Sequence, residues 1–104
     1  MGKKLVALCA CPMGLAHTFM AAQSLEKAAK ELGYEVKIET QGADGIQNEL
    51  TLKDIKEADI IIHAVAVTPL DPDRFEGCDV HEITLQQAIK NAKSIIQEIE
   101  ESMK

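Results

Sequence analysis

Three cysteines and three histidines are the side chains of this sequence best suited to act as nucleophiles, proton carriers or metal ligands. One of them has distinctive neighbours, because Cys11 begins the run Cys11-Pro12-Met13-Gly14-Leu15-Ala16-His17-Thr18. An apolar segment precedes this run, and a helical pattern begins near residue 16. Cys11 is therefore expected in a loop between a strand and the N-terminus of a helix.

A thiol at the start of a helix has a defined chemistry. Helix N-termini carry unpaired N–H groups and partial positive charge, so they bind anions. The same environment lowers the pKa of a thiol, and the thiolate is the reactive form. Gly14 lets the backbone approach a bound group, and Pro12 stiffens the turn. The pattern favours a thiolate inside a ring of backbone amides, an arrangement suited to phosphoryl transfer.

Two other interpretations of these residues remain open. Cys11 to Thr18 has the spacing of the small Cys-dependent phosphatases, Cys-x5-Arg-[Ser/Thr], with Asp71-Pro72 as a possible acid loop. His17 stands where those enzymes have Arg, so the bidentate clamp on phosphate is missing. The other interpretation is an inert cysteine beside an ordinary loop, since free cysteines are often buried.

A metal site is a further alternative. It would combine Cys9 and Cys11 with His17 and His63, but Cys-x-Cys without a paired Cys-x2-Cys motif is a weak pattern. We expect Cys9 and His63 to be structural. We also expect no metal and no other cofactor.

Composition limits the classes of function. A chain of 104 residues is expected to form a single domain, 1–104. The net charge of −6 and the single arginine argue against nucleic-acid binding. That arginine, Arg74, is expected either to bind a partner or to pair with Asp71 or Asp73. An odd number of cysteines and no apolar stretch of about 20 residues favour a cytoplasmic protein.

Hydrophobic periodicity predicts alternating strands and helices. Strands are expected at 5–9, 34–39, 59–67 and 80–83, and helices at about 16–32, 52–57 and 85–99, with a helical turn at 73–75. Thr51 and Thr84 are expected to cap the second and third helices. This order predicts an α/β single-domain sandwich: a four-stranded parallel sheet with helices on both faces, Rossmann-like and doubly wound. Ligands of such sheets bind beyond the carboxyl ends of the strands, where the Cys11 loop lies.

The run at 11–22 resembles the active-site loop of the fructose-family IIB components of the bacterial sugar phosphotransferase system (PTS), Cys-Pro-x-Gly-[Ile/Leu]-Ala-His-Thr-Phe-Met-Ala-Ala. The resemblance extends over nearly the whole chain, through 25–29, 39–42, 45–46, 48–51, 54–55, 58–59 and 74–77. It departs at Met13, where the family usually has Thr, and at Cys78, where Lys is common. The segment 63–69 replaces a more acidic one.

This resemblance implies a phosphocysteine intermediate on Cys11. The phosphoryl group would come from a phosphohistidine on a IIA protein and pass to a sugar, fructose or a related one, held by a membrane-embedded IIC partner. The implied phosphate cradle consists of Pro12, Met13, Gly14, Leu15, Ala16, His17 and Thr18. Gln41 and Gly42 would lie at the rim of the site. A regulatory IIB-like module, in which phosphorylation is a signal, is the alternative within the same family.

Overall fold

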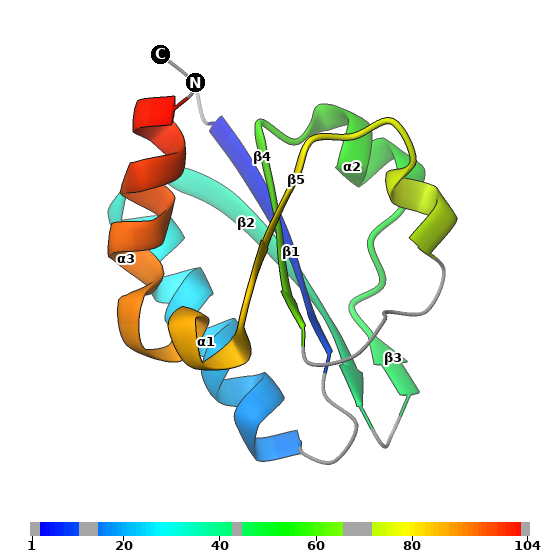
Figure 1. The fold of residues 1–104 in the computed structure, drawn as a ribbon. Helices are drawn as coiled ribbons and strands as arrows, with labels where there is room; N and C mark the ends of the chain where they lie inside the picture. Colours follow the sequence, from blue (N-terminus) through cyan, green and yellow to red (C-terminus); the bar gives the residue numbers. More distant parts are fainter. Residues whose placement is uncertain (1–2, 11–14, 43–44, 66–71, 103–104) are drawn as a thin grey trace.

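The computed structural model describes residues 3–10, 15–42, 45–65 and 72–102, without the side chains of 15–17, 42 and 72 (Figure 1). Its elements, in chain order, are β1 (Lys3–Ala10), α1 (Leu15–Glu31), β2 (Tyr34–Gly42), β3 (Gly45–Gln47), α2 (Leu52–Glu57), β4 (Ile60–Val65), the 3-10 helix η1 (Pro72–Phe75), β5 (Val80–Ile83) and α3 (Leu85–Ser102). The strands and helices expected from the sequence are all present.

The strands form one five-stranded sheet in the order β3-β2-β1-β4-β5. The four predicted strands pair in parallel, which confirms that part of the expectation. The fifth strand, β3, pairs antiparallel with the end of β2 and was not predicted. It is three residues long and lies beside two left-handed positions, Gly45 at φ 92° and Asn48 at φ 54°. So short a segment among turn residues carries no strand periodicity.

Side chains alternate between the two faces of the sheet, and each face has its own cover. Helices α1 and α3 lie on one face, and α2 and η1 on the other (Figure 1). Leu5, Ala7 and Cys9 of β1 pack under α1 and α3. Val6, Leu8 and Ala10 face the second cover, which contributes Leu50, Ile55 and Phe75. The sheet is therefore buried on both sides, as a doubly wound fold requires.

The carboxyl ends of three strands meet at one edge of the sheet. Ala10, the last residue of β1, pairs in register with Gln41 of β2 and with Val65 of β4. The connection 11–14 leaves from this edge and leads to α1, which begins at Leu15. The strand before Cys11 and the helix after it are thus confirmed.

Both predicted helix caps are present. The Thr51 hydroxyl accepts a hydrogen bond from Asp54 N at 3.1 Å, and the Asp54 carboxylate accepts one from Thr51 N at 3.0 Å. At α3, Thr84 Oγ1 accepts from Gln87 N at 3.0 Å, and Gln87 Oε1 accepts from Thr84 N at 2.9 Å. Each box satisfies two backbone donors that the helix itself leaves unpaired.

We predict that Thr84→Ala lowers the free energy of unfolding by about 1 kcal/mol, because Gln87 N loses its acceptor. Urea denaturation followed by circular dichroism measures the change. Thr84→Ser keeps the hydroxyl and is the matched control, with a smaller expected loss. Equal losses in the two variants would show that the hydroxyl does not stabilise the helix.

Candidate active site

The predicted nucleophile belongs to a connection whose two ends are fixed. Cys11, Pro12, Met13 and Gly14 lie outside the described residues, as do the side chains of Leu15, Ala16 and His17. Thr18, in the first turn of α1, is buried with 3% of its surface exposed. The role of residues 12–18 as a phosphate cradle stays a prediction. The structure establishes its setting, between the carboxyl end of β1 and the N-terminus of α1.

The predicted rim residues close β2. Gln41 is buried and lies in register with Ala10, the residue before Cys11. Its Nε2 donates to Glu39 Oε2 at 2.6 Å. Gly42 is the last residue of β2. Both residues thus lie at the same sheet edge as the start of the Cys11 loop, and their place at the rim of a site stays a prediction.

Sequence reasoning did not single out the buried carboxylate of Glu39 as part of the site. Its side chain is fully buried, on the sheet face that α2 and η1 cover. Oε1 accepts from Leu50 N at 2.7 Å and from Arg74 Nη1 at 2.7 Å. Oε2 accepts from Gln41 Nε2 at 2.6 Å and from Arg74 Nη2 at 3.0 Å. Four donors therefore surround this one carboxylate.

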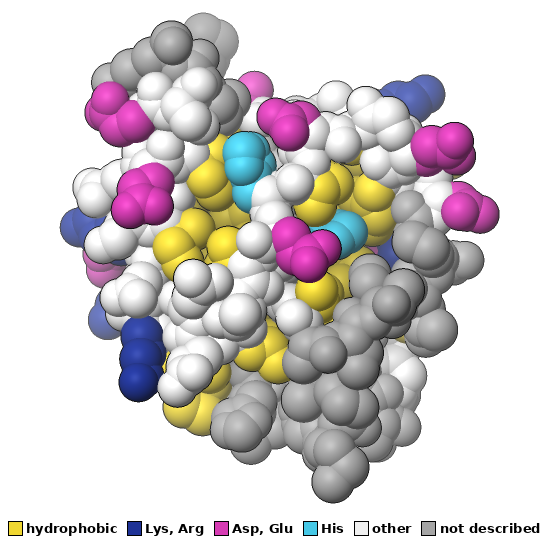
Figure 2. Space-filling view, viewed as in Figure 1, with side chains coloured by type: hydrophobic (Ala, Val, Ile, Leu, Met, Phe, Trp, Pro, Cys, Tyr) yellow, Lys and Arg dark blue, Asp and Glu magenta, His cyan; other side chains and the backbone are white. Residues whose placement is uncertain are grey.

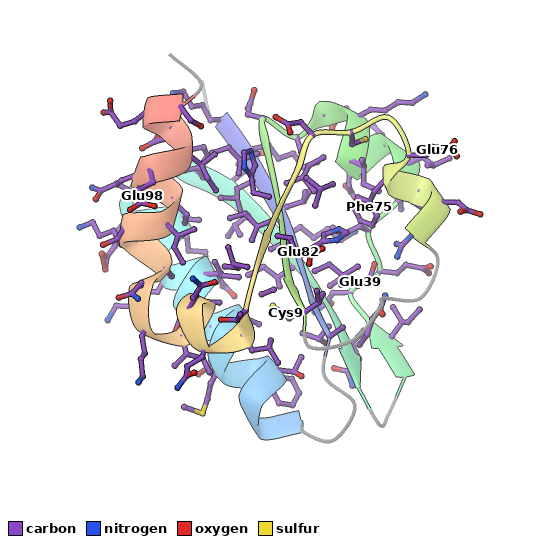
Figure 3. The ribbon with its side chains drawn as sticks, viewed as in Figure 1. Cys9, Glu39, Phe75, Glu76, Glu82 and Glu98 are labelled. Carbon is purple, nitrogen blue, oxygen red and sulfur yellow. The ribbon has the colours of Figure 1, made fainter. Side chains whose placement is uncertain are left out.

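Arg74 binds Glu39, which lies 35 residues away in sequence and was not among the partners expected for it. One of the expected partners, Asp71, lies outside the described residues. Two guanidinium nitrogens donate hydrogen bonds to the two carboxylate oxygens, and Nη1 also donates to Leu50 O at 2.8 Å. The guanidinium carbon lies 5.3 Å from the centre of the Phe75 ring. Figure 3 shows Glu39 and Phe75 on the same side of the sheet. The sequence held one indication of this pair: a single arginine in the chain and an acidic residue inside a predicted strand.

The electrostatics of this cluster favour the ion pair. Burial raises the pKa of Glu39, but the hydrogen bonds from Arg74, Leu50 and Gln41 outweigh it, and the net pKa is below the ordinary value. Glu39 is therefore ionised at neutral pH. It is a saturated acceptor, which leaves it without a lone pair for a substrate proton.

His63 is buried, as a structural residue would be, and its structural role stays a prediction. It is buried in β4, in register with Leu8, and meets Phe75 edge to face with ring centres 4.4 Å apart. Burial lowers the pKa of His63 and outweighs the negative charges of Glu82 and Glu39, which act to raise it. The imidazole is therefore neutral near pH 7. Its Nε2 has no hydrogen-bond partner among the described residues.

The core position expected for Cys9 is confirmed, and it disfavours the metal alternative. Cys9 is buried under α1 and α3, and burial raises the pKa of its thiol to about 12. His63 projects from the opposite face of the sheet, because its register partner is Leu8. Within the described ranges, no three His, Cys, Asp or Glu side chains are grouped so that they could hold a metal ion.

The charge on the surface is mainly acidic. Acidic side chains are scattered over the face in Figure 2, and lysine and arginine side chains lie mostly at its margins. This agrees with the net charge of −6. In the part of the chain that the structure describes, no helix combines the length and apolar character needed to cross a membrane.

Fold and site together define a class: a small doubly wound α/β protein with a cysteine loop between its first strand and first helix. Residues 6–98 match the family model described as "PTS system, Lactose/Cellobiose specific IIB subunit". The chain is 78% identical over 101 residues to "PTS system fructose-like EIIB component 1" of Escherichia coli (strain K12), covering 97% of this chain and 94% of that protein. It is 44% identical over 97 residues to "PTS system fructose-like EIIB component 2" of the same strain, covering 93% of this chain and 92% of that protein.

Solved structures agree with these relatives. The solution structure of the Enzyme IIB subunit of the PTS system from Escherichia coli K12 superposes with a TM-score of 0.94 at 77% identity, covering 99% of this chain and 95% of that one. A domain of the fructose-specific IIABC component from Borrelia burgdorferi has a TM-score of 0.87 at 45% identity, covering 94% and 93%. The chain belongs to the IIB family of the sugar phosphotransferase system. It is a phosphotransferase, and the predicted family is confirmed.

The names of these similar proteins differ in the sugar they give. The family model names lactose and cellobiose, whereas the two relatives are called fructose-like. A lactose-specific IIB domain from Streptococcus pneumoniae shares the fold at a TM-score of 0.51 and only 15% identity. The higher identities make the fructose-like proteins the better guide to this chain.

We predict that acid destabilises the fold partly through Glu39. The folded pKa of Glu39 is below its unfolded value of about 4.3. Its contribution to stability is therefore complete above that value and is lost as the pH falls through the folded pKa. Urea denaturation from pH 7 to pH 3 should show a shallower acid loss in Glu39→Gln than in the unmodified protein, from a lower starting stability. Parallel curves would contradict an ionised Glu39 in the fold.

Proposed function

We propose that this chain is a cytoplasmic phosphoryl carrier in which Cys11 receives a phosphoryl group from a phosphohistidine on a IIA protein or domain. The group then passes to a sugar, fructose or a related one, that a membrane-embedded IIC component imports. Residues 1–104 act as a single IIB domain in this scheme. The observation that carries the proposal is the position of Cys11, directly after the last residue of β1 at the carboxyl edge and ahead of α1.

The chemistry follows from that position. The Cys11 thiolate attacks phosphorus in line as the P–N bond to the donor imidazole breaks, and an S–P bond forms. Backbone N–H groups of 13–18, leading into the start of α1, take up the charge on the equatorial oxygens. In the second step a sugar hydroxyl attacks phosphorus, the S–P bond breaks and the thiolate is restored. The hydroxyl proton leaves to solvent or to a group of the acceptor site.

The other two cysteines are poor candidates for this role. Cys9 is buried in the core, and its pKa of about 12 keeps it protonated. Cys78 is exposed but comes just before β5, whose amino end lies at the opposite edge of the parallel sheet. Only Cys11 follows a strand at the carboxyl edge.

Arg74 argues against the phosphatase alternative. A Cys-dependent phosphatase of the Cys-x5-Arg kind needs a guanidinium fork aimed at the phosphate. The chain has one arginine, and both of its Nη atoms donate to Glu39. We therefore expect poor hydrolysis of aryl phosphates, which suits a carrier because hydrolysis would waste the phosphoryl group.

Two exposed apolar side chains near the start of α1 suit a protein partner. Phe19 and Met20 are 44% and 47% exposed, one turn after the helix begins. Phe19 also lines a surface groove with Ala22, Val36 and Thr40. In the proposed scheme a IIA donor covers these side chains while its phosphohistidine reaches Cys11.

We predict that a phosphorylated IIA donor transfers one labile phosphoryl group to Cys11. Radiolabel transfer followed by peptide mapping locates it. Cys11→Ser should fail, because an unactivated hydroxyl is a poor nucleophile.

Cys9→Ser and Cys78→Ser are the matched controls, and both should keep the label. Label on a histidine, or label that survives in Cys11→Ser, would refute the mechanism. Label that accumulates but never reaches a sugar in the presence of the IIC component would favour the regulatory role.

A further inference from the structure

We propose that the Glu39–Arg74 ion pair is a positioning device for phosphoryl transfer. It joins the connections that follow β2 and β4 and holds them beside the strand that leads to Cys11. This inference rests on the proposed function, because it assigns a task to residues around the Cys11 site. The two residues act through others, so they are positioning residues.

The cluster joins two segments that follow strands in the chain, one after β2 and one after β4. Arg74 lies in η1, where the chain returns after leaving β4 at Val65. Leu50 lies at the end of the excursion that includes β3. The Leu50 N–H donates to Glu39 at 2.7 Å, and its carbonyl accepts from Arg74 at 2.8 Å. Both backbone groups of Leu50 are thereby fixed by one ion pair.

Glu39 also contacts the residue of β2 that pairs with the last residue of β1. Its Oε2 accepts from the Gln41 side chain at 2.6 Å, which fixes the orientation of that amide. Gln41 pairs with Ala10, and Cys11 is the next residue. A displacement of Glu39 would therefore shift Gln41, whose register partner Ala10 directly precedes the loop. Misplacing a reacting group by about 1 Å can cost on the order of 100-fold in rate.

A second ion-pair cluster provides a matched control at the opposite end of the sheet. Asp54 of α2 accepts from Lys37 at 2.7 Å and from Lys4 at 3.2 Å. Lys4 lies at the amino end of β1, and Asp54 belongs to the helix that follows β3. Its distances resemble those of the Glu39 pair, but both of its lysine partners lie in the amino halves of the strands. Its remaining contact is with Thr51 N, and Asp54→Asn keeps an amide oxygen that can accept from it. Weakening it should reduce stability without disturbing the carboxyl edge.

The informative variant is Arg74→Lys. Lysine keeps the positive charge, but its single ammonium cannot span the three oxygens that Arg74 reaches on Glu39 and Leu50. A positioning role therefore predicts a loss that the retained charge does not repair. Glu39→Gln is a second variant, in which two of the four donors would face an amide N–H₂.

The experiment measures phosphoryl transfer to Cys11 from phosphorylated IIA over a range of donor concentrations, at a temperature where all variants are folded by circular dichroism. For Arg74→Lys we expect the rate constant at saturating donor to fall at least about tenfold. The half-saturating donor concentration should stay within about twofold, because the docking surface is intact. Asp54→Asn should lose stability in urea and keep its transfer rate.

Three outcomes would overturn the inference. One is transfer by folded Arg74→Lys at the unmodified rate. Another is a loss confined to the half-saturating concentration. The third is an equal fall in rate for Asp54→Asn, which would mean that stability alone controls transfer. Failure of the unmodified protein to label on Cys11 would instead reject the proposed function.

Discussion

The fold of this IIB protein depends on a carboxylate buried inside its sheet. Removing an ion from water costs on the order of several kcal/mol unless its partners replace the lost hydration. Glu39 is fully buried, and four hydrogen bonds from Arg74, Leu50 and Gln41 replace that hydration. The ends of β2, of the β3 excursion and of η1 must therefore meet at one place. Loss of any donor would leave a buried charge poorly compensated, which makes the arrangement specific.

The two faces of the sheet have different tasks. Under α1 and α3 the core is almost entirely aliphatic, and there Cys9 behaves as a small apolar side chain. The face under α2 and η1 contains a polar row in register across the strands, from Glu39 past Leu8 to His63 and Glu82. One face thus supplies stability by burial, and the other organises the connections at the carboxyl edge. The Cys11 loop, for which we propose a role in phosphoryl transfer, begins at that edge.

Local patterns in the sequence predicted most of the fold. The apolar run before Cys11, the buried isoleucines of β4 and the amphipathic stripe of α3 each have a clear periodicity, and the caps at Thr51 and Thr84 follow from short spacings. Strand β3 could not be predicted, because its three residues stand among turn positions. The Glu39–Arg74 pair was missed for another reason: its partners are distant in sequence, and only the folded sheet brings them together. For Arg74, the sequence indicated only the neighbouring aspartates as partners within the chain, whereas the structure also pairs it with Glu39.

In the proposed function, the thiol of Cys11 carries the phosphoryl group. Phosphorus-31 NMR of the protein, recorded after incubation with a phosphorylated IIA donor and removal of that donor, tests it most directly. Sulfur-bound and nitrogen-bound phosphate resonate at different positions, so the linkage is read without cleaving the chain. We expect one resonance of a thiol-linked phosphate, which disappears when sugar and the IIC component are added. A nitrogen-linked resonance, or no protein-bound phosphate in a fully folded sample, would contradict it.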